Sequence, residues 1–401
     1  MFKKSKSMIS VTEAKQIIKD NCKALKPVML ELLKASGKIL AKDIFSTMDI
    51  PSFPQSSMDG YAFNFDGYTL YKNLQLTGEI AAGDNKNILL KQNEAVRIFT
   101  GAPVPQGADT VVMQEKTNVE NNVLIIADDN IKKGSNVRPQ GSEIKENFLA
   151  LEKGDLLTAA AIGFLAGIGN TEVFIYPSPC ITIIVTGNEL QSPGLPLEFG
   201  QVYESNSPAL EAALRSYNID NIIIKRVEDN LAAITTALQN AITVSDIVLL
   251  TGGVSVGDYD FVVKAAENCG IEKLFHKIKQ KPGKPLFFGK KENKIIFGLP
   301  GNPSSVLTCF YQYVVPALQL LQNKQVILKE MKAELIGSFN KPAGLTHFLK
   351  GHFDGTKVNI LPAQESYRIQ SFAKANCLIE VDENITQLNE GDTVNIYILS
   401  C

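Results

Sequence analysis

A short apolar run that ends in glycines, within residues 246–261, constrains the fold of this chain more than any other feature. Residues 247–250 are too few for a helix, and the glycines that bound them favour a strand. Residues 251–253 break the run, and the apolar spacing from 259 to 266 suits a helix. A strand, a glycine-rich turn and a helix in this order indicate one unit of an α/β fold.

The glycine-rich turn leaves two interpretations open. It is either a plain tight connection or a phosphate cradle, because glycines let the backbone come close and free amides at a helix start attract anions. Asp258 and Asp260 fall in the first turn of the predicted helix. Two carboxylates there would repel a phosphate unless a metal lies between them. The cradle interpretation therefore predicts a phosphorylated ligand together with a divalent cation.

Strand and helix patterns alternate through residues 177–325, which predicts a doubly wound, largely parallel sheet. The predicted elements are strands at 181–185 and 222–227 and helices at 208–217, 231–242 and 302–321, the last kinked at Pro316;. Ligands of such sheets bind beyond the carboxyl ends of the strands. Glu189 and Asp260 follow two of these strands, so we expect them to face one crevice.

The segments before and after residues 177–325 have different sequence patterns. Residues 8–45 look helical: Ser10 and Glu13 have the spacing of a capping box, and residues 28–40 repeat apolar side chains at helical spacing;. Another helical pattern covers 158–168. Short alternating runs with turn signals predict a small β domain at 49–138 and a second one from residue 326. The strands of the second are predicted at 332–337, 358–361, 377–381 and 393–399.

The densest basic stretch, residues 276–285, contains three alternating lysines that would share one face of an extended chain;. Lysines in such a pattern commonly protect an exposed sheet edge. The sequence Pro-Gly-Lys-Pro at 282–285 favours another interpretation, because it indicates a rigid turn that fixes Lys281 and Lys284. Two lysines on a rigid turn beside an anion cradle suit a phosphate or an oxyanion such as molybdate.

Two further motifs are ambiguous by themselves. Residues 299–304 join a strand to a helix, with Asn302 as the N-cap and Pro303 in the first helical position;. That explanation is sufficient for Asn302, and the functional alternative is a second rim of amides on the same crevice. Asp59 lies on a loop of the first β domain, where a lone aspartate is usually a turn former.

Composition narrows the function classes. The net charge of −2 argues against a general nucleic-acid binder, and the apolar stretches at 156–168 and 306–321 are shorter than the ~20 residues that span a bilayer;. The six cysteines form no Cys-x-x-Cys pair, and three histidines do not supply a histidine-rich metal centre;. We therefore expect a cytoplasmic protein without membrane or nucleic-acid partners, and a hard cation on oxygen ligands if a metal is used.

Eight motifs, in order from end to end of the chain, resemble the molybdopterin molybdenumtransferase family (MoeA, or gephyrin E-domain). They are SMDGYA (57–62), TGAPVPxGADTVV (100–112), NVRPxG (136–141), TGNEL (186–190), TGGVSVGDYD (251–260), KPGKP (281–285), LPGNPSS (299–305) and QSF (370–372). The resemblance implies a transferase that converts adenylylated molybdopterin and molybdate into molybdenum cofactor and AMP, with Mg²⁺. It also implies an elongated homodimer, with molybdopterin adenylyltransferase as a candidate partner enzyme.

The same resemblance organises the fold and the site. The fold class it implies is multidomain α/β and β, with four parts: a helical domain (1–48 plus 139–176), an inserted small β domain (49–138), a central doubly wound α/β molybdopterin-binding domain (177–325) and a C-terminal β-barrel-like domain (326–401). The implied catalytic residues are Asp59, Glu189, Asp229 and Asp260, and the implied metal ligands are Glu189, Asp260 and Glu143. The implied binding residues are Thr100, Gly252, Gly253, Ser255, Gly257, Lys281, Lys284, Pro300, Asn302, Pro303, Lys350 and Ser371.

Two positions depart from the family pattern. After the NVRPxG motif the usual aspartate is replaced by Ser142 followed by Glu143, and Lys350 stands where an arginine is usual in the last domain. A glutamate can still bind a metal or polarise a water, whereas a lysine loses the two-pronged grip of a guanidinium on an oxyanion. The sequence does not decide between molybdate and tungstate, since the two oxyanions are nearly the same size.

Two alternative functions remain to be weighed. One is molybdopterin adenylyltransferase, whose single domain resembles residues 177–325 only, so the remaining segments count against it. The other is a gephyrin-like binding scaffold, which could lose Asp59 and Asp260, and this chain has both. The sequence therefore favours the transferase.

Overall fold

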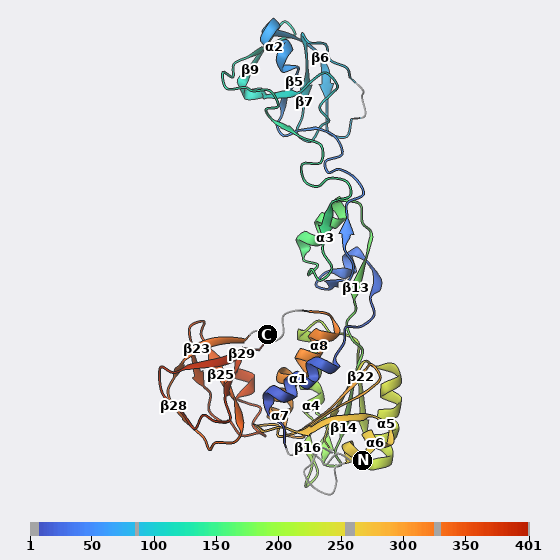
Figure 1. The fold of residues 1–401 in the computed structure, drawn as a ribbon, viewed down its shortest axis with the longest axis vertical. Helices are drawn as coiled ribbons and strands as arrows, with labels where there is room; N and C mark the ends of the chain where they lie inside the picture. The colour runs from blue at the N-terminus through green and yellow to red at the C-terminus, as the bar shows by residue number, and fades with distance from the viewer. Residues whose placement is uncertain (1–7, 85–87, 253–260, 325–329, 400–401) are drawn as a thin grey trace. The chain divides into compact units, whose positions relative to one another are not determined.

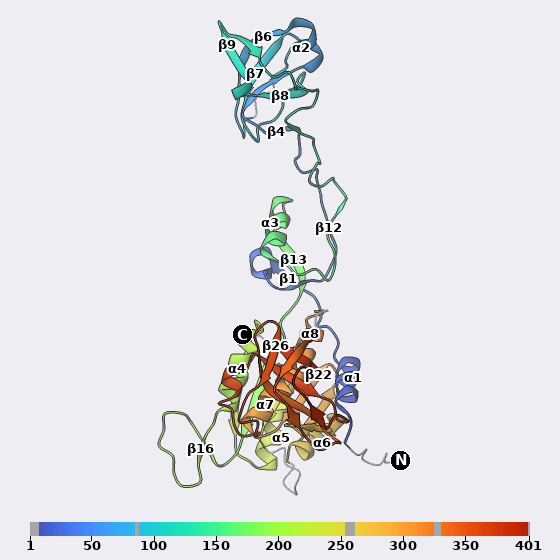
Figure 2. The ribbon, with the colours of Figure 1, turned by 90° about the vertical axis from the view of Figure 1, so that its left-hand side faces the viewer.

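The computed structural model describes residues 8–84, 88–252, 261–324 and 330–399 (Figures 1 and 2). The chain divides into two units, which are described separately: residues 29–174 form the smaller unit, and the rest of the chain forms the larger one. Among the described helices, none combines the length and the apolar character needed to cross a bilayer.

The larger unit is built on a six-stranded sheet in the order β17-β14-β18-β22-β21-β19, of which the first four strands are parallel. The strands are β14 (Ile181–Thr186), β17 (Ile222–Val227), β18 (Ile247–Thr251), β19 (Glu272–Lys277), β21 (Pro285–Lys291) and β22 (Lys294–Leu299). Every residue of β14 and β18 is buried, which explains why these strands read as continuous apolar runs;. The predicted doubly wound α/β domain is confirmed.

Helices cover both faces of this sheet. Alternate residues of β14 separate into two cores: Ile183 packs with the helices of one face and Ile184 with those of the other;. The first face carries α1 (Val11–Asn21), α4 (Asn206–Ser216), α7 (Pro303–Cys309) and α8 (Val315–Leu321), and the second carries α5 (Leu231–Val244) and α6 (Phe261–Asn268). The capping box of Ser10 and Glu13 is present at the start of α1, as predicted.

The helix predicted at 302–321 is interrupted in its middle. A π-helical segment, η3 (Phe310–Val314), separates α7 from α8, and Pro316 follows it. Proline lacks an amide hydrogen and its ring clashes with the carbonyl one turn earlier. A wider π turn relieves that crowding and rotates the side chains that follow. The predicted simple kink is therefore a change of helix type.

A closed β-barrel follows in the larger unit. Five strands close into a ring, because the first pairs with the last: β25 (Thr346–Phe353), β26 (Lys357–Ile360), β23 (Glu330–Ile336), β29 (Thr393–Ile398) and β27 (Cys377–Val381). A two-residue strand, β20 (Gln280–Lys281), adds to β25 in parallel, and a short pair joins β24 (Phe339–Asn340) to β28 (Gln387–Leu388). The predicted barrel-like C-terminal domain is thus confirmed.

The smaller unit contains a six-stranded sheet in the order β8-β5-β7-β6-β10-β9 with one helix, α2 (Phe65–Tyr71). Its strands are β5 (Gly60–Phe63), β6 (Asn73–Ile80), β7 (Glu94–Ile98), β8 (Thr110–Met113), β9 (Thr117–Glu120) and β10 (Val123–Ile126). Apolar side chains on both sides of this sheet are buried, in two clusters. The strands all lie in the segment where short alternating runs predicted a β domain.

The remainder of the smaller unit contains short strands where a helix was predicted, which corrects one prediction. Residues 28–40 form β1 (Val28–Glu31), one 3-10 turn and β2 (Ile39–Leu40), because both strands pair with β13 (Glu172–Tyr176). Helix α3 (Ala159–Gly167) forms as predicted. Two short antiparallel pairs join the outgoing and returning chain: β3 (Ile44–Phe45) with β12 (Leu149–Leu151), and β4 (Gln55–Ser56) with β11 (Val137–Arg138). The four domain boundaries stay a prediction.

Candidate functional site

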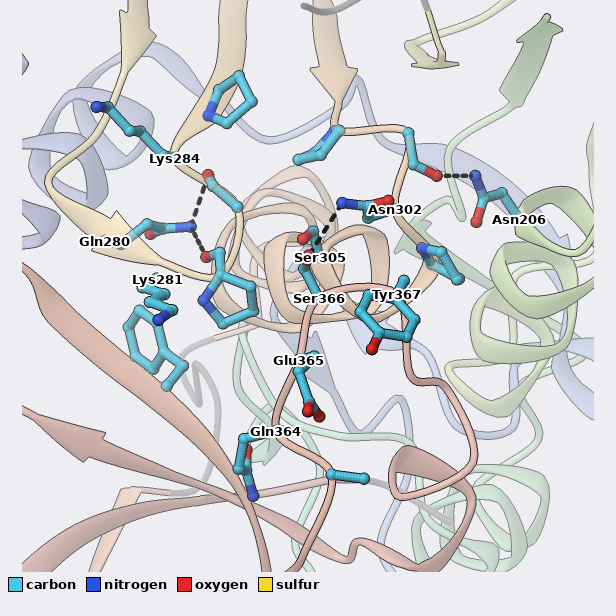
Figure 3. A pocket seen from close by; sticks show the side chains of 18 of the residues that line it. Asn206, Gln280, Lys281, Lys284, Asn302, Ser305, Gln364, Glu365, Ser366 and Tyr367 are labelled. Carbon is cyan, nitrogen blue, oxygen red and sulfur yellow. Dashed lines mark hydrogen bonds between the residues drawn. The ribbon is translucent and has the colours of Figure 1, made fainter. Parts of the chain in front are cut away.

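A cavity of about 1360 Å³ opens in the larger unit, where turns after the parallel strands meet loops of the barrel (Figure 3). Glu189 follows β14, Gly252 follows β18, and Pro300–Pro303 follow β22, so three strand ends contribute to the lining. This is the crevice that the topology of a parallel sheet predicts. The barrel contributes the opposite part of the wall, including Gln364–Tyr367.

Gly252 shows how closely two of these turns approach. Its φ is +88°, and a Cβ on it would lie 2.0 Å from the carbonyl oxygen of Thr186. Only glycine avoids that collision. The predicted cradle continues into residues 253–260, so Gly253, Ser255, Gly257 and Asp260 lie outside the described residues.

The turn with the Pro-Gly-Lys-Pro sequence lies at the cavity, where Lys281 and Lys284 are both exposed (Figure 3). The three alternating lysines do not share one strand, however. Strand β19 ends at Lys277, and Lys281 belongs to β20 of the barrel sheet. Lys279, between them, lies 3.6 Å from a carboxylate oxygen of Glu383. Lys281 and Lys284 thus line the cavity, whereas Lys277 and Lys279 do not.

The start of α7 is capped differently from the prediction. Pro303 occupies the first helical position, but the side chain of Asn302 does not cap the helix. Its Nδ2 donates instead to Oγ of Ser366 at 2.9 Å, and the carbonyl of Ser366 accepts from the amide of Ser304 at 3.0 Å (Figure 3). A barrel loop therefore supplies the cap and closes this side of the cavity.

Lys350 and Ser371 lie beneath that barrel loop, not in the cavity lining. Lys350 is 2% exposed, and its ammonium donates to the carbonyls of Ala363 at 2.7 Å and Arg368 at 3.0 Å. The hydroxyl of Ser371 donates to the same carbonyl of Ala363 at 2.9 Å. Burial lowers the pKa of Lys350. Both side chains support the loop in this structure, and their predicted contact with a ligand stays a prediction.

Among the glutamates that line the cavity, Glu189, Glu204 and Glu365, only Glu189 was predicted. Glu189 lines the cavity, whereas Oδ1 of Asp229 accepts from the hydroxyl of Thr186 at 2.9 Å, next to the turn that carries Glu189. Glu143 is exposed in the smaller unit. Within the residues that the structure describes, no three Asp, Glu, His or Cys side chains lie close enough together to hold a metal.

The smaller unit holds Asp59 and Thr100 together. Oδ1 of Asp59 accepts from both the amide and the hydroxyl of Thr100, each at 2.8 Å. These bonds, the amide first, lower the pKa of the Asp59 carboxyl, and Arg97 adds to the effect. A cavity of about 490 Å³ adjoins the pair and is lined further by Met58 and Met113–Lys116. The predicted Asp59 is thus fixed as an anion on an exposed loop.

Several lining residues had no signal in the sequence. Asn206 holds the Pro-Gly turn after β22 by donating to the carbonyl of Gly301 at 2.8 Å. Lys341 and His347 come from the barrel, and burial lowers the pKa of His347 to about 4, helped by Lys341 and Lys281. Only the strand pairing of the barrel brings these side chains to the cavity.

Known families match almost the whole chain. The MoeA N-terminal region (domain I and II) matches residues 9–169, a probable molybdopterin binding domain matches 182–320, and the MoeA C-terminal region (domain IV) matches 332–399.

Individual relatives agree with these matches. The chain is 34% identical to a molybdopterin molybdenumtransferase of Haemophilus influenzae, over 92% of each chain. It is 32% identical to one of Staphylococcus epidermidis, over 99% of this chain and 97% of the relative. Among solved structures, a molybdopterin biosynthesis MoeA protein of Pyrococcus horikoshii is similar with a TM-score of 0.79 and 26% identity, over 98% of this chain and 100% of that one.

Proposed function

The chain belongs to the MoeA family of molybdopterin molybdenumtransferases, and from that premise we propose that it inserts molybdate into adenylylated molybdopterin with Mg²⁺-dependent release of AMP. It is a transferase of molybdenum cofactor biosynthesis. The observation that carries the finer proposal is the large cavity at the strand ends, in which two exposed lysines, Lys281 and Lys284, stand on one turn.

The lysines suit the oxyanion. Molybdate carries two negative charges and no proton donor at neutral pH, so cations and donors are what a protein needs to hold it. Lysine ammonium groups are compact point charges with three donors each. Lys281 and Lys284 hold molybdate, and Pro300, Asn302 and Pro303 form the adjoining wall. Thr100 and Asp59 act on the reacting groups from the smaller unit's loop.

Release of AMP needs the phosphate charge to be neutralised. Mg²⁺ takes carboxylate oxygens, waters and substrate phosphates. Glu189, a hard oxygen donor on the cavity wall, fits such an ion, and it would share the ion with Asp260. When bound, Mg²⁺ supplies charge neutralisation for the departing phosphate. The protein's own contribution is to hold substrate with the lysines and to keep Asp59 ionised through its two hydrogen bonds with Thr100.

A second copy of this chain is the proposed partner. Large apolar side chains are exposed on and beside the short strands of the smaller unit, and a contiguous apolar patch of this kind would mark an interaction surface. They include Met29, Leu33, Phe45, Phe148 and Leu149. A homodimer of 43.8-kDa subunits would be measured by light scattering.

Incubation with adenylylated molybdopterin, Mg²⁺ and molybdate, with AMP followed by chromatography, tests the proposal. Wild-type protein should release AMP only when the oxyanion and Mg²⁺ are both present. Tungstate in place of molybdate decides which oxyanion the chain prefers. AMP release that is indifferent to the oxyanion would overturn the proposal. Transfer of adenylyl to molybdopterin would instead favour an adenylyltransferase, to which the matched N- and C-terminal regions give no support.

A further inference from the structure

Gln280 is buried directly before Lys281, with its side chain inside the lysine turn (Figure 3). Its Nε2 donates to the carbonyl of Pro282 at 3.1 Å and to that of Gly283 at 3.0 Å. Carbonyl oxygens only accept, so the amide nitrogen must face the turn and Oε1 must point away from it. Chemistry alone therefore fixes the orientation of this amide.

Tyr313 completes the arrangement from the helical layer. It lies in η3 with no exposed surface, and its hydroxyl donates to Oε1 of Gln280. Burial raises the pKa of Tyr313 well above its ordinary value, so the hydroxyl keeps its proton and remains a donor. The wider turn of η3 rotates the side chains that follow α7. The helix is thus interrupted at Tyr313, the residue that donates to Gln280.

Gly283 shows how tightly the turn rests on this pair. Its φ is +85°, and a Cβ there would lie 2.5 Å from Sγ of Cys309 and 2.8 Å from Nε2 of Gln280. The base of the turn is closed by a bond from the amide of Ile278 to the carbonyl of Lys284, at 3.0 Å. The backbone between the two lysines is thus held from inside and at its base.

We propose that Gln280, oriented by Tyr313, is a positioning residue that fixes the turn so that Lys281 and Lys284 present their ammonium groups to one oxyanion. The inference rests on the proposed function, because it concerns the same reaction. A lysine is a flexible point charge on a four-carbon stem, so the backbone decides where its charge can reach. Gln280 and Tyr313 act through the turn, as positioning residues.

Gln280→Glu is the sharpest test, since it keeps the shape and removes both donors. The carboxylate would face two carbonyls and repel them, whereas its protonated form could still donate to one. We expect the KM for molybdate to rise roughly tenfold or more, as for small misplacements of binding groups, with a smaller fall in kcat. Part of the loss should be recovered when the pH is lowered. Tyr313→Phe, which removes only the hydroxyl, should raise the KM less and without that recovery.

Gln312→Leu is the matched control. Gln312 is buried in the same π-helical segment, and no hydrogen-bond partner is found for its side-chain nitrogen or oxygen among the described residues. Its replacement should leave the KM for molybdate unchanged. An unchanged KM in the folded Gln280→Glu protein, or an equal rise in the control, would overturn the proposal.

Hydrogen exchange separates this inference from the proposed function. The backbone amides of residues 278–281, 283 and 284 should exchange faster in Gln280→Glu and Tyr313→Phe than in wild type and in the control. If wild type shows no oxyanion-dependent release of AMP, the proposed function fails, and exchange still decides whether Gln280 holds the turn. If release is normal and exchange in this turn is unaltered by Gln280→Glu, the proposed function stands and the positioning role fails.

Discussion

Two donors of Thr100 converge on a single carboxylate oxygen of Asp59. Hydrogen bonds to the charged form favour ionisation, and here the backbone amide contributes more than the hydroxyl;. A folded-state pKa below the ordinary value contributes stability that is present above pH ~4 and is lost as the pH falls through the lowered pKa. At neutral pH the group is therefore an anion throughout.

Thr100→Val should raise the pKa of Asp59 only part of the way to its ordinary value, because the amide bond remains while the hydroxyl bond is lost. Carboxyl ¹³C chemical shifts, followed through an acid titration, measure this. Thr117→Val is the control, since the hydroxyl of Thr117 donates to the carbonyl of Gln114 and not to a carboxylate. A titration of Asp59 identical to that of wild type would show that the hydroxyl bond is absent in solution.

The pKa of His347 is a second quantity that can be followed at a single residue. Its pKa is lowered to about 4, by burial first and then by Lys341 and Lys281. An oxyanion held by Lys281 and Lys284 would oppose the repulsion from the lysines, so binding should raise the pKa of His347. Lys281→Ala should raise it in the absence of oxyanion and weaken the further rise.

Imidazole resonances measure this cleanly, because the chain has three histidines. The exposed His352 serves as an internal reference. Since the unfolded chain protonates His347 near pH ~6.5, wild-type stability should fall as the pH drops from there toward 4, and His347→Gln should flatten that fall. A His347 signal that ignores both the lysine substitution and the oxyanion would contradict the predicted position of the oxyanion.

Among the elements, those defined by local periodicity were predictable from sequence. Strands β14 and β18 are apolar runs between turns, and α1 begins at a capping box. Residues 28–40 were mispredicted because apolar spacing at short range fits a helix and a strand equally well. Pairing with β13, which lies more than a hundred residues further along the chain, decides for strand there.

The residues of the candidate site also divide into those that a local motif predicted and those that only the folded chain brings to the cavity. Motifs at the strand ends predicted Glu189, Gly252 and the lysine turn, which the structure brings to one cavity. The barrel half of the wall had no motif, because its residues reach the cavity only through the register of distant strands. Ser366 is an example: it caps α7 from a loop of the barrel, and no local pattern marks it.

The barrel loop 361–371 should lose stability when its support from Lys350 is removed. Lys350→Met should leave the carbonyl of Arg368 without the ammonium donor and that of Ala363 with the hydroxyl of Ser371 alone. An unmade bond of this kind costs about 1–3 kcal/mol. Chemical denaturation should show a loss of that order, with faster exchange in the loop.

Lys357→Met is the matched control, because Lys357 forms an exposed pair with Glu334 at 2.6 Å. Such surface pairs contribute about 0–1 kcal/mol. Equal stability of the Lys350→Met protein and wild type, together with weaker oxyanion binding, would assign Lys350 to the ligand and not to the loop.

At the scale of the whole molecule, the predicted site residues are distributed over two units: Asp59 lies in the smaller, and Glu189 and Lys281 lie in the larger. We predict that in a homodimer each site takes Asp59 from one subunit and Asp260 from the other. Twofold symmetry then gives two equivalent composite sites.

Mixing inactive Asp59→Asn and Asp260→Asn proteins under subunit exchange tests this. Half of the dimers should be mixed, and each mixed dimer carries one intact site, so about a quarter of wild-type AMP release should return. Mass spectrometry of differently tagged subunits verifies exchange. Exchange without recovered activity would place both aspartates in the site of a single chain, or leave Asp59 as a turn former.

The pairing of β20 with β25 links the lysine turn of the α/β domain to the barrel. Gln280 lies opposite Thr346 and Lys281 opposite His347, so the lysine turn is also an edge of the barrel. An α/β domain transplanted without its barrel would lose the hydrogen-bonding partner of that strand. Oxyanion binding is therefore not a property that the α/β domain can carry alone into a chimera. A graft that is to keep it must include both the turn and the strand beside it.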